Sequence, residues 1–309
     1  MLASVTDLEE VPLEPLAARH GVAAERAREL LALLDDARLL APPPANRRGP
    51  DREPVPARLG DELQVHALLS EDADGAALLH ARASRSVAVV GLGRTGAVVA
   101  GTLAAAGVGT LELSDPELVS PHEPGVGGIS ERDVGARREQ AVARAVTDLA
   151  PGTRALVGEL ESPEVLVLVA SYGVDPDVMA GFEARGLPVL PIVVREAGAS
   201  VGPFVAPGSS PCWRCVDRHL ADADPDWPLV LAQLCARARR RSAPQAAELA
   251  QLAGSLAASQ VLAVLDGGVP ATAGASLELA LPQPMVQRRE WSTHPACGCA
   301  DHVPAWSPC

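Results

Sequence analysis

The chain has 309 residues, a formal net charge of −13 at pH 7 and a hydrophobic fraction of 48%, enough for a sizeable buried core. The acidic balance argues against a nucleic-acid-binding protein, because binding phosphates needs a basic face. Residues 1–14 lack the basic start and apolar stretch of a signal peptide, and no window reaches the roughly 18 apolar residues of a membrane span. We therefore expect a cytoplasmic protein with no membrane partner.

Hydrophobic spacing predicts two short helices around a turn at Gly21 within residues 12–40. In the second of them, apolar residues recur at helical intervals from Ala27 to Leu34. These helices are too short to form a core alone, which indicates a small helix-turn-helix-like unit over residues 1–40. Proline and charged residues dominate the next stretch, so we predict a linker over 41–60 and a main domain over 61–309.

Buried strands alternate with helices along the main domain. We predict strands over 87–90, 110–113, 165–170, 187–194 and 276–281, and helices over 97–106, 135–149 and 244–265. Pro244 would occupy the first turn of the last helix, where its missing N–H costs nothing. This alternation predicts an α/β fold with a doubly wound, Rossmann-like, mostly parallel sheet.

A glycine-rich turn joins the first strand to the first helix. Gly91, Gly93 and Gly96 form a G-x-G-x-x-G motif, in which glycines permit a tight turn, close approach of a phosphate and helix packing. Asp115 follows the next strand, where a carboxylate can accept a hydrogen bond from a ribose hydroxyl. These residues predict a nucleotide-binding fold, and from them alone NAD and ATP are both open.

Cysteines occur in two close pairs, Cys212 with Cys215 and Cys297 with Cys299. Four thiolates can complete a closed tetrahedral zinc site, which has no position for a catalytic water and is structural. Redox thiols are the alternative, and His219 and His294 are alternative ligands near the pairs. Cys235 and Cys309 are predicted to be idle thiols.

Together these motifs resemble the ThiF/MoeB and ubiquitin-activating superfamily, whose members adenylate a C-terminal carboxylate with ATP. The resemblance covers about residues 85–300, through VAVVGLGRTGAVVAGTLAAAGVGTLELSDPELV and the two cysteine pairs. The phrases PGSSPCWRCVDRHLADADPDWP and HPACGCA further resemble the ThiF-like partner proteins of YcaO-type cyclodehydratases. Such partners bind the leader of a ribosomal precursor peptide through an N-terminal winged-helix domain. The present chain begins at what resembles the second helix of that domain.

The resemblance implies catalytic positions that this chain only partly retains. The ribose-binding acid falls on Asp115 and the second acid of the D-x-D on Glu117, while the family's lysine falls on Arg138. The stretch that should supply an asparagine and an arginine reads SPHEPGVGGIS. Ser171, Tyr172 and Gly173 stand where the Mg²⁺-binding aspartate is expected, and Asp175 is shifted along the chain.

Loss of several phosphate- and metal-binding groups together should remove adenylation, which depends on charge stabilisation. We therefore expect no catalytic residues, structural zinc, ATP only as an open possibility, and a homodimeric scaffold that delivers a precursor peptide to a YcaO-type cyclodehydratase. One alternative is an active adenylyltransferase for a peptide or carrier-protein C-terminus, with Arg138 replacing the lysine and Asp175 the metal ligand. A third possibility is an NAD-linked oxidoreductase, against which the cysteine pairs weigh.

Overall fold

The computed structural model describes residues 17–37, 54–69, 74–158, 160–208 and 210–299. Contacts divide the chain into two compact units, residues 1–80 and 81–309. The division at residues 40 and 60 stays a prediction, and Cys309 lies outside the described residues.

The first unit contains helices only, among its described residues. They are α2 (Ala24–Asp36), the 3-10 turn η3 (Ala57–Leu59), α3 (Gly60–Leu69) and the start of α4 (Gly75–Ala83). The predicted helix around Ala27 and Leu34 corresponds to α2, and the helix expected before Gly21 lies largely outside the described residues. Helices α3 and α4 were not predicted, because α3 has apolar residues around most of its circumference rather than along one stripe.

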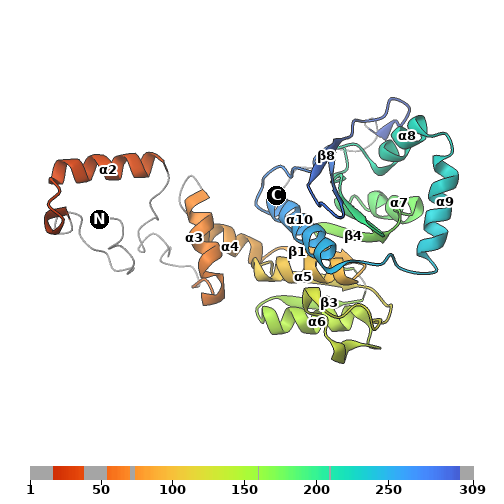
Figure 1. The fold of residues 1–309 in the computed structure, drawn as a ribbon, viewed down its shortest axis with the longest axis horizontal. Helices are drawn as coiled ribbons and strands as arrows, with labels where there is room; N and C mark the ends of the chain where they lie inside the picture. The colour runs from red at the N-terminus through yellow and green to blue at the C-terminus, as the bar shows by residue number, and fades with distance from the viewer. Residues whose placement is uncertain (1–16, 38–53, 70–73, 159, 209, 300–309) are drawn as a thin grey trace. The chain divides into compact units, whose positions relative to one another are not determined.

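The second unit is built on one eight-stranded sheet in the order β3-β2-β1-β4-β5-β6-β7-β8 (Figure 1). Its strands are β1 (Ser86–Val90), β2 (Thr110–Ser114), β3 (Arg154–Val157), β4 (Val165–Ser171), β5 (Val189–Arg195), β6 (Gly198–Val201), β7 (Ala275–Ala280) and β8 (Gln287–Glu290). The first five strands pair in parallel and the last three antiparallel. The predicted α/β fold with a mostly parallel sheet is confirmed.

Helices cover both faces of the sheet because the central strands are apolar on both sides. The helices of this unit are α5 (Arg94–Ala105), α6 (Arg138–Leu149), α7 (Pro176–Ala184), α8 (Trp213–Ala223), α9 (Trp227–Ala238) and α10 (Ala247–Leu265), with short 3-10 turns η4 (Val126–Gly128) and η5 (Glu131–Asp133). Val87 and Val89 of β1 join the larger core with α5, α6 and α10, whereas Ala88 joins the smaller core with α7 and α8. This alternation is the period-two pattern of a strand buried on both faces.

Strand order reverses between β1 and β4, since the chain runs from β1 to β2 and β3 on one side and returns to β4 on the other. In open α/β sheets, ligands bind at the carboxyl ends of the strands flanking such a switch point. The fold therefore places Gly91, which follows β1, beside the end of β4.

Helix α10 is the central core helix and packs closely on α5 (Figure 1). It is long and apolar enough to cross a membrane by composition, but 56% of its most apolar window is buried within the protein. The prediction that this helix begins near Pro244 was wrong, because α10 starts at Ala247. Residues 242–246 are extended instead, and their polar groups bind the neighbouring site.

Gly254 of α10 provides a test of this packing. A Cβ there would lie 2.7 Å from the Cβ of Val98 and 2.9 Å from the carbonyl oxygen of Thr95, both on α5. We expect Gly254→Ala to lower the free energy of unfolding by about 1–3 kcal/mol through overpacking. Gly181→Ala in α7, where a Cβ meets nothing within 4 Å, should be neutral or stabilising by up to about 1 kcal/mol. Urea unfolding of both variants checks this, and equal stabilities would contradict it.

Candidate functional site

The glycine-rich turn adopts the geometry that its motif predicts. Gly91 has a φ of 87°, and a Cβ on it would lie 2.5 Å from the carbonyl oxygen of Val169 in β4. A Cβ on Gly96 would collide with the backbone carbonyl of Gly91. Gly93 is the N-cap of α5 and has no side chain to satisfy the helix N-terminus. Gly91 and Gly96 therefore require glycine for backbone reasons, whether or not a nucleotide is bound, whereas Gly93 has a φ of −64° and space for a Cβ.

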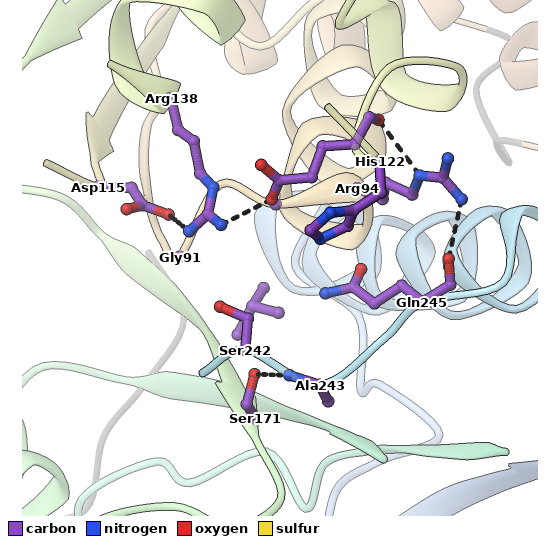
Figure 2. Close-up of a pocket in the computed structure, with 12 residues that line it drawn as sticks. Gly91, Arg94, Asp115, His122, Arg138, Ser171, Ser242, Ala243 and Gln245 are labelled. Carbon is purple, nitrogen blue, oxygen red and sulfur yellow. Dashed lines mark hydrogen bonds and ion pairs between the residues drawn. The ribbon is translucent and has the colours of Figure 1, made fainter. Parts of the chain in front are cut away.

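The N-terminus of α5 is occupied by the extended segment before α10. The side-chain oxygen of Gln245 accepts hydrogen bonds from the backbone N–H of Thr95 at 2.9 Å and from its hydroxyl at 2.8 Å. Arg94 donates to the Gln245 carbonyl at 2.9 Å (Figure 2), and Ala243 donates its N–H to the Ser171 hydroxyl at 3.0 Å. A helix N-terminus of this kind is where a phosphate would accept hydrogen bonds. Here Gln245 takes that place.

Arg138 lies at the centre of a buried ionic cluster with three carboxylates. Its guanidinium is 2.7 Å from Glu123, 2.5 Å from Glu117 and 3.4 Å from Asp115. The side chains of Arg138, Asp115 and Glu123 are 7–8% exposed, whereas Glu117 is largely exposed. Asp115 also accepts a hydrogen bond from the N–H of Leu92 at 2.7 Å. Figure 2 shows Arg138 between Asp115 and a second carboxylate, so the predicted ribose and phosphate ligands bind each other.

Burial and charge act in opposite directions within this cluster. Burial raises the pKa of Asp115, and the Leu92 N–H and Arg138 only partly offset this effect. Burial also disfavours the charge on Arg138, but Asp115 and Glu123 raise its pKa overall. Arg138 therefore stays protonated and neutralises carboxylates that would otherwise be costly to bury. Its Nε is buried without a hydrogen-bond partner in the described part of the chain.

The space enclosed between these groups is small. The cavity lined by Gly91, Gly93, Asp115, Glu123 and Arg138 measures about 60 Å³. Pockets for small ligands usually measure about 300–1,000 Å³, and one water takes about 30 Å³ of liquid. By itself the cavity has room for a few waters, and a nucleotide would have to extend beyond it.

The position of the missing metal ligand is filled by other interactions. Ser171 lines the cavity and accepts the Ala243 hydrogen bond. Asp175 does not line it, but caps α7 by accepting from the Asp177 N–H at 3.1 Å. Arg239 pairs with Asp175 at 3.0 Å. The Asp175 carboxylate therefore lies at the α7 N-terminus and not in the nucleotide-like cavity.

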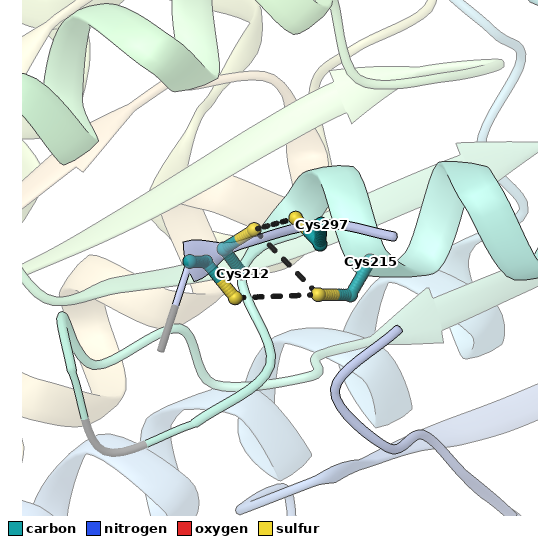
Figure 3. A group of neighbouring side chains, drawn as sticks. Cys212, Cys215 and Cys297 are labelled. Atoms are coloured by element: carbon teal, nitrogen blue, oxygen red, sulfur yellow. Dashed lines mark hydrogen bonds between the residues drawn. The ribbon is translucent and has the colours of Figure 1, made fainter. Parts of the chain in front are cut away.

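The four cysteines predicted as metal ligands converge in the structure. Cys212 caps α8 and Cys215 lies in its first turn, while Cys297 and Cys299 follow β8. Their sulfur atoms all lie within 4.8 Å of one another, with Cys212 at 3.4 Å from Cys297 and Cys215 at 3.5 Å from Cys299 (Figure 3). Tetrahedral zinc–thiolate bonds of about 2.3 Å imply sulfur separations of about 3.8 Å, whereas a disulfide bond is about 2.05 Å long. The cluster is thus compatible with a zinc site.

The two histidines proposed as alternative ligands have other partners. His294 lies 2.9 Å from the Asp222 carboxylate and accepts from the Ala296 N–H at 3.1 Å. His219 lies 3.0 Å from the Ser292 carbonyl oxygen. Burial raises the pKa of Cys212 and raises that of Cys215 to about 11. A metal bound by these thiols must therefore displace protons, so its affinity should fall as the pH is lowered.

Sequence analysis missed Arg94, Glu123 and Gln245 as residues of the site. An acid within SPHEPGVGGIS, a stretch that lacks the asparagine and arginine of the resembled family, was the one available signal for Glu123. Gln245 carried no signal, because residues 244–265 were predicted as one helix. Cys235 is buried in α9, away from the cysteine cluster.

The comparisons with known proteins agree with this architecture. Residues 66–299 match the ThiF family model, and the chain belongs to the ThiF family. Among solved structures, E. coli MccB with ATP has a TM-score of 0.68 at 16% identity, covering 94% of this chain and 85% of that chain. The microcin C7 biosynthetic enzyme MccB with N-formylated MccA has a TM-score of 0.70 at 16% identity, covering 90% and 83%. PaaA has a TM-score of 0.62 at 17% identity, covering 90% and 85%. A search of curated proteins finds no match.

Arg138 is the residue on which the buried cluster depends. We expect Arg138→Met to lower the free energy of unfolding at pH 7 by about 3–5 kcal/mol, because it leaves buried carboxylates without a counter-charge. Burial already raises the pKa of Asp115, and without Arg138 that pKa would be higher still, so the folded variant binds a proton before the unfolded chain does. The deficit relative to the unsubstituted protein should therefore shrink as the pH falls from 7 towards 5.

Arg132→Met is the control, since its side chain is 73% exposed and that of its partner Asp148 is 71% exposed. It should cost less than about 1 kcal/mol at either pH. Urea unfolding of both variants measures these differences. A loss that is the same for the two variants, or that does not depend on pH, would contradict the assignment.

Proposed function

We propose that this chain is a non-adenylating member of the ThiF family, which binds a ribosomal precursor peptide and delivers it to a YcaO-type cyclodehydratase for azoline or azole formation. The observation that carries the proposal is the Arg138 cluster. A nucleotide site needs cations and N–H groups that can bind phosphates, and here Arg138 is bound by carboxylates and the Thr95 N–H by the Gln245 amide.

The charge of the cavity supports the same conclusion. Glu123 is buried, accepts a hydrogen bond from the Ser120 N–H at 2.6 Å and pairs with Arg138. A polyanionic triphosphate would have to displace this carboxylate from Arg138, its ion-pair partner among the described residues, or lie beside it in a poorly solvated site. Either route costs several kcal/mol. The residues present do not fit ATP, and no chemical step is assigned to it.

The similar solved structures support a peptide as the binding partner. MccB has been solved with MccA and with N-formylated MccA, as well as with ATP. In our proposal this chain keeps peptide binding and has lost the chemistry at the nucleotide site. Its role is then to hold a peptide chain close to a partner enzyme, which requires surface complementarity and no catalytic residue. The proposed scaffold acts as a homodimer, as the family resemblance implies.

A structural zinc ion in the cysteine cluster completes the proposal. Four thiolates fill the tetrahedron, so the metal has no open position for a water or substrate. Zinc would join α8 to the segment after β8, which are 85 residues apart at Cys212 and Cys297. By comparison with zinc-finger peptides, such a site stabilises the folded state by an amount on the order of 10 kcal/mol.

Metal analysis tests the zinc site. We expect about one zinc ion per chain, lost in both Cys212→Ser and Cys299→Ser because three thiolates cannot close the site. Cys235→Ser is the control, since Cys235 lies outside the cluster, and it should retain the metal. Full zinc content and unchanged thermal stability in both ligand variants would refute the assignment.

The nucleotide site is tested by ATP–pyrophosphate exchange in the presence of the precursor peptide. We expect no exchange above background, and peptide binding measured by fluorescence anisotropy that is unchanged by ATP, because the phosphate-binding groups are occupied. Exchange that is robust and disappears in Asp115→Ala would overturn the proposal and identify an adenylyltransferase. Anisotropy with a chain lacking residues 1–58 then shows whether the leader binds the N-terminal unit or the main domain.

A further inference from the structure

A second and larger cavity adjoins the closed nucleotide-like cavity. It measures about 1,030 Å³ and is lined by the loop after β2, the end of β5 and the connection between α9 and α10. Arg94, Arg138 and Gln245 line both cavities, so the two adjoin at the α5 N-terminus. This groove is large enough for several residues of an extended peptide.

The lining of the groove is basic although the protein as a whole is acidic. Five arginines line it, at positions 94, 138, 239, 240 and 241, against two carboxylates, Glu117 and Glu196. The formal net charge of the chain is −13. A concentration of cations on such a background focuses the local field on the groove.

Most of these charges are already paired. Arg138 binds Glu117, and Arg237 binds Glu196 at 2.6 Å. Arg239 binds Asp175 at 3.0 Å, and Arg94 donates to three backbone carbonyls. Both carboxylates are thus taken. The two remaining guanidinium groups, Arg240 and Arg241, are exposed and have no acidic partner among the described residues.

We propose that Arg240 and Arg241 bind carboxylates of a peptide lying in this groove, so that the peptide partner carries an acidic segment. The inference rests on the proposed function and names the chemistry of its ligand. Guanidinium groups bind carboxylates through two parallel hydrogen bonds, which fixes a flexible chain in register. The acidic surroundings disfavour a nucleic acid, whose charges extend well beyond the groove.

The connection between α9 and α10 explains why these arginines are held in place. At the end of α9, the backbone N–H groups of Arg240 and Arg241 both donate hydrogen bonds to the Arg237 carbonyl. Two residues later, Ala243 is anchored to Ser171 and Gln245 to Thr95. The side chains therefore extend from a backbone fixed on both sides, which lowers the entropy lost when a ligand binds.

The test compares two double variants with the same change in charge. Arg240→Gln/Arg241→Gln removes the proposed pair, and Arg154→Gln/Arg185→Gln removes two exposed arginines that do not line the groove. The probe is a short fluorescein-labelled peptide of alternating Glu and Ser with an amidated C-terminus. Anisotropy should show affinity lowered by about tenfold or more in the first variant, and by less than about twofold in the control.

Two further peptides distinguish the source of the carboxylate. In both peptides Gln replaces Glu. One has an amidated C-terminus and the other has a free C-terminal carboxylate. Binding of the free-acid Gln peptide, without binding of the amidated Glu peptide, would assign the pair to a terminal carboxylate and overturn the acidic segment. Binding of the amidated Gln peptide as tightly as the Glu peptide, or equal affinities in the two double variants, would overturn it. Displacement by inorganic phosphate at constant ionic strength would also overturn it, by showing a phosphate site.

The result is independent of the exchange assay that tests the proposed function. If exchange activity is found and the Arg240→Gln/Arg241→Gln variant still loses affinity for the Glu peptide, the scaffold role is wrong and the acidic ligand is retained. If there is no exchange and the Arg240→Gln/Arg241→Gln variant binds the peptide as tightly as the unsubstituted protein, the scaffold role stands and its peptide binds outside this groove.

Discussion

Arg138 and the carboxylates around it determine what this ThiF-family site can do. A buried guanidinium needs counter-charge, and Asp115 and Glu123 supply it at the carboxyl end of β2 and in the loop that follows. The same constraint applies in reverse, because neither carboxylate could remain ionised and buried without Arg138. Arg138 is thus the counter-charge of a cluster that remains net negative, with one guanidinium against two buried carboxylates. A polyanionic ligand would disturb it rather than complete it, although the glycine turn and the strand order of a nucleotide-binding fold are both retained.

The segment between α9 and α10 connects this cluster to the rest of the molecule. By extending through residues 242–246 instead of starting α10 early, the chain brings Gln245 to the α5 N-terminus and Ala243 to Ser171. Two helix-forming residues are given up, and in exchange the orphan N–H of Thr95 is satisfied. The same segment carries Arg240 and Arg241 to the edge of the larger groove. Closing one cavity and providing the basic lining of the other are therefore consequences of one backbone path.

The cysteine cluster has a different physical role from the cavity, since it lies on α8 and after β8 rather than at the switch point of the sheet. Strand β8 is short, exposed along its length and at the sheet edge, so few apolar contacts hold it. The proposed zinc ion would tie α8 to the segment beyond β8 and so compensate for that weak edge. Fold stability and the state of the nucleotide-like cavity can then vary independently.

Local patterns in the sequence were sufficient for the central strands, for α5, α6 and most of α10, and for the two cysteine pairs, because each depends on periodicity or spacing within a short stretch. The glycine motif and its spacing also pointed to Gly91, Gly93, Gly96 and Asp115, whereas Arg138 came only from the family resemblance. Strands β3, β6 and β8 escaped, since each has only four residues and depends on its partner strand for hydrogen bonds. That Arg138 binds Asp115 and Glu123, and that Gln245 reaches Thr95 from 150 positions away, was decided only by the tertiary structure. The reason is physical: pairing of buried charges depends on which groups the fold brings together, and no local pattern in the chain encodes that distance.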